Sequence, residues 1–92
     1  MPGEQHGAPV TVRYWAGARA AAGVDQDQVS AEVTAGAGLT VAGVLESVTA
    51  RRPALGAIVG VSTLLLDGRA VRADAPITGG ALLEVLPPFA GG

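Results

Sequence analysis

Cysteine, lysine and histidine, which often act in catalysis or metal binding, are absent or rare in this chain, and this excludes several kinds of active site. Its 92 residues include no Cys, which excludes disulfides, thiolate metal sites and thiol catalysis. All six basic residues are Arg, so no lysine amine can form a Schiff base or accept an isopeptide bond. The one histidine, His6, lies in a polar stretch with no other candidate ligands beside it.

The acidic side chains are not spaced as a catalytic or metal-binding group. Asp67 is followed by Gly68, and Asp-Gly is typical of a tight turn between two strands. Asp25 and Asp27 stand in a polar segment, and we expect both to be solvated. Three further carboxylates lack the spacing of a metal cluster, namely Glu32, Glu46 and Asp74. The sequence therefore predicts no metal site.

The best candidate for a reacting group is the C-terminal carboxylate of Gly92. The segment that leads to it contains, in order, Pro87, Pro88, Phe89, Ala90 and Gly91. The two prolines form a stiff spacer that should project the last residues away from the folded part. Glycine has no Cβ, so the end of the tail can enter a narrow channel and bend there.

Hydrophobic periodicity predicts the elements that must hold this tail. Strands are expected at residues 10–15, 29–33, 61–66, 69–71 and 81–86. Between them we expect a short Ala-rich helix at 16–23, a polar turn at 25–28 and a loop at 55–60. The two prolines that follow residue 86 should end the last strand, because proline cannot donate to a strand ladder.

One longer helix gives the clearest signal. Thr40 is a suitable N-cap, and Pro53 should stop the helix. Its buried face is predicted from the i, i+3, i+4, i+7 spacing of Val41, Val44, Leu45 and Val48.

The order of two strands, one helix and three strands predicts an α+β protein with a β-grasp fold. In this fold a mixed five-stranded sheet packs on one main helix. We expect a flexible N-terminal tail at residues 1–8, one domain at 9–88 and a flexible C-terminal tail at 89–92. The core must be built mainly from Val, Leu, Ile and Ala, because the chain has only three aromatic residues, Phe, Trp and Tyr.

Charge and hydropathy exclude several classes of partner. The net charge of −2 is incompatible with the large basic patch that nucleic-acid binding needs. The sequence contains neither a signal-peptide pattern nor an apolar run of membrane-spanning length. We therefore expect a cytoplasmic protein that contacts neither nucleic acid nor membrane.

Residues 83–92, LEVLPPFAGG, resemble the C-terminal signature of the MoaD/ThiS family of ubiquitin-fold sulfur carriers. The two prolines before the Gly-Gly end are most similar to the MoaD-like branch, the small subunits of molybdopterin synthase. Near the start, residues 14–19, YWAGAR, resemble the family's aromatic-aromatic-Ala-x-x-Arg segment. One departure is Ala81, which stands where many MoaD-like members have an acidic residue.

The resemblance implies that this chain is a carrier and not by itself an enzyme. An activating enzyme of the ubiquitin-activating type, using ATP and Mg²⁺, would adenylate the Gly92 carboxylate. A sulfur donor would then convert the adenylate into a thiocarboxylate. A sulfur acceptor, the large subunit of molybdopterin synthase in the MoaD-like case, would take the sulfur. No cofactor is expected to stay bound.

The alternation of the last strand predicts where partners bind. The outward-facing residues would be Leu82, Glu84 and Leu86, and the inward-facing ones Leu83 and Val85. If Glu84 faces solvent, Leu82 and Leu86 on the same face are exposed too. Together with Phe89 they would form an apolar patch at the base of the tail, as partner sites often do.

Other functions stay open on the sequence alone. The sulfur could serve the synthesis of thiamine, cysteine or specialised metabolites instead of molybdopterin. A protein modifier joined through Gly92 to lysines of other proteins is a second class, although without Lys this chain cannot form lysine-linked chains of itself. A β-grasp binding module whose Gly-Gly end is incidental is a third.

Overall fold

The computed structural model describes residues 8–31 and 39–88, so the predicted tails fall outside it except for Ala8. Five strands are present: β1 (Val10–Tyr14), β2 (Gln26–Val29), β3 (Thr63–Leu66), β4 (Arg69–Val71) and β5 (Leu82–Leu86). The helical elements are α1 (Ala16–Ala22), α2 (Val41–Arg51), the 3₁₀-helix η3 (Pro53–Leu55) and α3 (Gly56–Val59).

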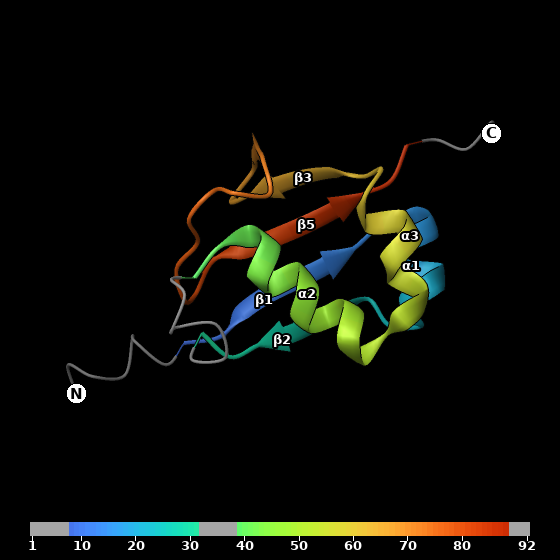
Figure 1. The fold of residues 1–92 in the computed structure, drawn as a ribbon, viewed down its shortest axis with the longest axis horizontal. Coiled ribbons are helices and arrows are strands. Elements are labelled where there is room, and N and C mark those ends of the chain that lie inside the picture. Colours follow the sequence, from blue (N-terminus) through green and yellow to red (C-terminus); the bar gives the residue numbers. More distant parts are fainter. Residues whose placement is uncertain (1–7, 32–38, 89–92) are drawn as a thin grey trace.

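The strands form one mixed sheet in the order β2-β1-β5-β3-β4 (Figure 1). β5 is in the middle, where it runs parallel to β1 and antiparallel to β3. α2 lies across one face of the sheet, while α1 and α3 lie near the end toward which β5 runs (Figure 1). This arrangement confirms the predicted α+β class and β-grasp fold.

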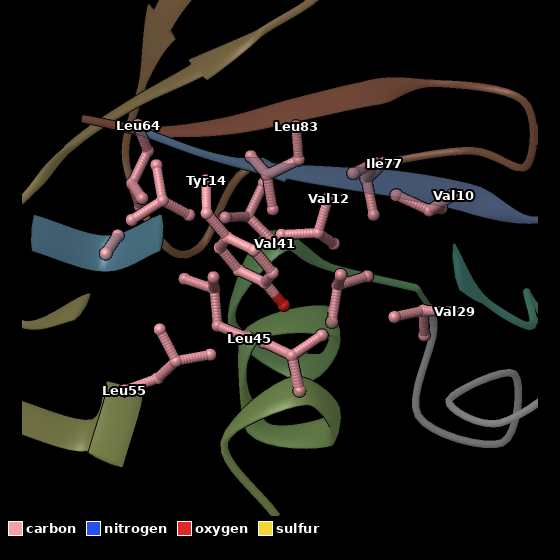
Figure 2. Packing of buried hydrophobic residues seen from close by; sticks show 14 of the residues in the cluster. Val10, Val12, Tyr14, Val29, Val41, Leu45, Leu55, Leu64, Ile77 and Leu83 are labelled. Carbon is pink, nitrogen blue, oxygen red and sulfur yellow. The ribbon is translucent and has the colours of Figure 1, made fainter. Parts of the chain in front are cut away.

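The core lies between the sheet and α2, because both present an apolar face to each other. Val12 and Tyr14 of β1 are buried, and so is Leu83 of β5. Figure 2 shows these side chains directed toward Val41 and Leu45 of α2. The four residues predicted for the buried face of α2 are all buried, namely Val41, Val44, Leu45 and Val48.

Three local signals in the sequence are confirmed. The Thr40 hydroxyl accepts a hydrogen bond of 3.1 Å from the N–H of Gly43, so Thr40 caps α2. Asp67 and Gly68 have φ values of 48° and 88°, as a type I′ turn requires, and this turn joins β3 to β4. β5 ends at Leu86, directly before the two prolines.

Three local predictions are wrong. The strand expected at 29–33 shares only Val29 with β2, which ends at that residue. The segment expected to be a polar turn contains most of β2, whose residues Gln26 and Gln28 are exposed while Asp27 and Val29 are buried. β2 is an edge strand with a polar outer face. Its alternation of exposed and buried residues is hard to recognise in the sequence, because one of the two buried side chains is a carboxylate. The segment expected to be a loop at 55–60 is helical, because Pro53 at the first position favours a 3₁₀ turn that runs into α3.

The sequence analysis expected Asp27 to be solvated, and this is wrong. Asp27 is buried, with 8% of its surface exposed, and its carboxylate is hydrogen-bonded. The guanidinium of Arg52, just past α2, donates to both of its carboxylate oxygens, from Nε at 2.7 Å and from Nη2 at 2.8 Å. The Tyr14 hydroxyl donates to Oδ2 at 2.6 Å. Arg52 also donates to the carbonyl of Ala22 at the end of α1. Asp27 and Arg52 together therefore link β1, β2, α1 and the end of α2.

The same contacts shift the pKa values of these groups. Hydrogen bonds from Arg52 outweigh the effect of burial and lower the pKa of Asp27. Burial, together with the hydrogen bond to Asp27, raises the pKa of Tyr14. Asp27 is therefore ionised and Tyr14 protonated throughout the neutral range.

The tight packing of Gly79 predicts a stability difference between two glycine substitutions. A Cβ at Gly79 would lie 2.3 Å from the backbone oxygen of Ala8, whereas one at Gly17 in α1 would meet nothing within 4 Å. We expect Gly79→Ala to lower the free energy of unfolding by about 2 kcal/mol. Gly17→Ala should raise it by about 0.5 kcal/mol, because alanine favours helix. Urea unfolding would measure both, and equal stabilities would contradict the packing described.

A second prediction concerns the Asp27 cluster. We expect Asp27→Asn to lower the free energy of unfolding by about 2–3 kcal/mol at pH 7, because Arg52 loses its buried partner. Since folding lowers the pKa of Asp27, its contribution is present above the unfolded pKa of about 4 and is lost as the pH falls through the folded value. The gap between wild type and variant should therefore close in acid.

The matched control is Asp25→Asn. Asp25 pairs with Arg19 at 2.7 Å, but both side chains are more than half exposed. Such a surface pair contributes less than about 1 kcal/mol, so this variant should unfold close to wild type. A gap between wild type and Asp27→Asn that stayed constant from pH 7 to pH 2 would contradict the role given to Asp27.

Candidate functional site

β5 delivers the predicted tail to one end of the sheet. Its inward residues Leu83 and Val85 are fully buried, as predicted, which fixes the strand in the core. Beyond its last residue, Leu86, the chain loses contact with the domain stepwise, because Pro87 is half-buried and Pro88 is exposed. The strand therefore aims the chain out of the sheet at Pro88.

The tail residues predicted to react lie outside the described residues. They are Phe89, Ala90, Gly91 and Gly92. Their roles stay predictions, and the described part of the site is the surface from which they leave.

That surface is the sheet face opposite α2, which we call the open face. Leu86 is half-buried on it, with Thr63 of β3 beside it as its register partner. On the other side, Trp15 follows Tyr14, the register partner of Val85, so Trp15 lies level with Leu86. Trp15 and Leu86 are therefore the large apolar side chains at the base of the tail.

Leu82 lies elsewhere on the open face. It is half-buried at the start of β5, beside Thr11 of β1. Leu86 lies four positions further along the strand, which corresponds to about 13 Å. Glu84, also half-buried, stands between them. Of the residues predicted for the partner interface, the structure thus brings Leu86, and not Leu82, to the base of the tail.

Trp15 is held in place on the open face by three contacts. Its indole Nε1 donates a hydrogen bond of 3.0 Å to Oε2 of Glu84. Its backbone N–H donates to the carbonyl of Val85 at 3.2 Å. The guanidinium carbon of Arg13 lies 4.7 Å from the centroid of its ring. Even so, Trp15 stays 39% exposed.

The chain turns sharply directly after Trp15. Ala16 has a φ of 47°, in the left-handed region that costs an alanine about 1 kcal/mol. This turn starts α1 and leaves Trp15 as the last residue level with β5 on the open face. Neither Arg13 nor Trp15 was among the site residues predicted from the sequence. Their strand parity, which matches that of Glu84, was the signal that could have singled them out.

The described residues also limit other chemistry. Within 8–31 and 39–88, no three His, Cys, Asp or Glu side chains gather into a group that could hold a metal ion. Among the helices of that same part, none has the length and apolar character needed to cross a membrane.

Comparison with protein families finds one match over most of the chain. The model of the ThiS family matches residues 12–92, which include all five strands except the first two residues of β1. A comparison with curated protein sequences finds no match.

Solved structures with the same fold come from several organisms. Small archaeal modifier protein 1 of Methanosarcina acetivorans is 27% identical, with a TM-score of 0.75, over 95% of this chain and 99% of that one. A Pyrococcus furiosus protein assigned as subunit 1 of molybdopterin converting factor is 26% identical, with a TM-score of 0.74, over 89% and 99%.

A third structure is a complex of subunits 1 and 2 of molybdopterin-converting factor from Helicobacter pylori. The similar chain is 18% identical, with a TM-score of 0.60, over 91% of this chain and 99% of that one. At this identity the likeness concerns the fold alone. The family match over residues 12–92 goes further, and on it this chain belongs to the ThiS family of ubiquitin-fold sulfur carriers, to which MoaD-like proteins are related.

Proposed function

We propose that this chain carries sulfur as a thiocarboxylate on Gly92. The observation that carries the proposal is the exit of β5 from the centre of the sheet into the Pro-Pro spacer, at the end of a chain that belongs to the ThiS family. A strand paired on both sides is a rigid base, so the segment that leads to the carboxylate starts from a fixed point.

The first step activates this carboxylate, which is a poor electrophile as it stands. An oxygen of the Gly92 carboxylate attacks the α-phosphorus of ATP, supplied with Mg²⁺ by the activating enzyme, and pyrophosphate leaves. The product is an acyl adenylate. The glycine residues lack side chains that would crowd this attack or the channel that leads to it.

The second step replaces AMP by sulfur. When the donor is a persulfide, its terminal sulfur attacks the carbonyl carbon, AMP leaves and an acyl disulfide forms. A thiol then attacks the donor's own sulfur, which leaves the thiocarboxylate on Gly92 and a disulfide between thiol and donor. The chain has no Cys and no Lys, so none of its own side-chain thiols or amines competes for the activated carbonyl.

Molybdopterin synthesis is the proposed destination of the sulfur. Support comes from the Pro-Pro spacer and from the similar Pyrococcus furiosus structure, which is named as subunit 1 of molybdopterin converting factor. In this role the chain is the small subunit and its acceptor is a large subunit that builds most of the shared active site. We propose the cytoplasm as the compartment.

Protein modification is the second candidate function. The Methanosarcina acetivorans structure, similar over 95% of this chain, is named a small archaeal modifier protein. The two functions share the adenylate and differ in the nucleophile, which is a lysine amine of a target protein in the second. A ladder of conjugates in lysate from the native cells would favour this second function.

We expect Gly92→Ala to abolish adenylation while the fold stays intact. The added methyl group would crowd the reacting carboxyl carbon, and position 92 comes six residues after the end of β5, so we expect the folding of the domain not to depend on it. ATP–pyrophosphate exchange with the activating enzyme of the same host would measure the loss, and circular dichroism would verify the fold. Gly3→Ala, which adds the same methyl outside the matched residues 12–92, is the control. Normal sulfur loading of Gly92→Ala would contradict the proposal.

We also expect Leu86→Asp to weaken binding to the activating enzyme at least tenfold with little loss of stability. Leu86 is half-buried at the base of the tail, so a charge there would oppose an apolar partner surface. Leu82→Asp, on the same face about 13 Å away, makes the matched comparison and should weaken binding less. Calorimetric titration would measure both, and a folded Leu86→Asp protein with wild-type affinity would disprove the interface.

A further inference from the structure

We propose that the activating enzyme binds one particular part of the open face. This part, here called the Trp15 anchor, consists of Arg13, Trp15 and Glu84. The anchor would place the tail before Gly92 reacts. The inference rests on the proposed function, because it assigns the surface that the partner of that reaction recognises.

The position of the anchor supports this role. Trp15 lies level with Leu86, the last residue before the Pro-Pro spacer. The backbone N–H of Trp15 donates a hydrogen bond to the carbonyl of Val85. β1 and β5 are parallel neighbours, so the anchor and the start of the tail belong to one rigid piece of sheet. A partner that holds Trp15 therefore fixes the point from which the tail departs.

The charges of the anchor are arranged in an unusual way. Arg13 and Glu84 are register partners on the same face, so a direct ion pair would be the simplest arrangement. Among the described residues Arg13 makes no ion pair. It stacks on the indole ring instead, while Glu84 accepts the indole N–H. Both charged side chains thus contact Trp15 and not each other.

This arrangement holds the Trp15 ring in one orientation before a partner binds. An exposed tryptophan that is fixed on one side by a hydrogen bond and covered by a guanidinium loses little freedom when a partner covers it. Trp and Arg are also the residue types most enriched among those that dominate binding energy. The 39% of Trp15 that remains exposed is the surface left for the partner.

The anchor also indicates the chemistry of the partner. The guanidinium of Arg13 is exposed, and its N–H donors have no acceptor among the described residues, so it can bind a carboxylate through two parallel hydrogen bonds. Trp15 and Leu86 call for an apolar pocket beside that carboxylate. We therefore infer an activating enzyme that offers an Asp or Glu next to an apolar pocket.

Steady-state adenylation tests the anchor, with the purified chain as variable substrate of its host's activating enzyme in ATP–pyrophosphate exchange. We expect Trp15→Ala to raise KM on the order of 30-fold and Arg13→Gln to raise it about tenfold, with kcat unchanged. Arg69→Gln, the same loss of charge at an exposed residue of the β4 edge, should have no effect.

A second measurement separates binding from misfolding. Because Trp15 is the only tryptophan, 5-fluorotryptophan gives a single fluorine resonance from this ring. In the folded wild-type chain that resonance should shift or broaden when the activating enzyme is added, without ATP. An unchanged resonance under saturating enzyme would overturn the proposal whatever the stability of the variants.

The outcomes distinguish this proposal from the proposed function. Suppose that Gly92→Ala abolishes adenylation while Trp15→Ala and Arg13→Gln keep the wild-type KM. This result would overturn the proposed role of the anchor but would agree with the carrier function. A wild-type chain that no activating enzyme of its host adenylates would overturn both.

Discussion

The last strand of the chain occupies the centre of the sheet, and the rest of the structure depends on this placement. β5 can pair only after β1 and β3 are present to receive it, so the first and last strands of the described chain meet through a contact between distant parts of the sequence. Such pairing carries a large loop-closure cost, which the burial of Leu83 and Val85 must offset. The rigid base of the tail and the completed core therefore form together.

Two carboxylates show how environment decides the role of a side chain. Asp27 is buried, ionised and held by Arg52, so its charge joins strands and helices inside the domain. Glu84 is half-buried on the open face, where it accepts the indole N–H of Trp15, and in the part of the chain that the structure describes it forms no ion pair with Arg13. The first stabilises the domain that carries the tail, and the second shapes the surface beside it. In the proposed function neither carboxylate takes part in the reaction.

Much of this organisation was present in the sequence. The alternation of β5 predicted its buried face, and the 3.6-residue period predicted that of α2. The Thr40 cap, the turn at Gly68 and the end of the sheet before Pro87 were also predicted. These features depend on backbone geometry and on neighbours within a few residues, which a single sequence displays directly.

Only the tertiary structure decided the features that depend on distant partners. β2 was missed because its buried Asp27 looks like a loop residue until Arg52 neutralises it. The contact between Trp15 and Glu84, and the separation of Leu82 from Leu86 along the open face, follow from the register of β1 against β5. The sequence by itself determined most of the strands and the main helix, and the reaction expected at Gly92 stays a prediction made from it. The long-range pairing decided what stands beside that tail, because side chains remote in sequence meet only when strands pair.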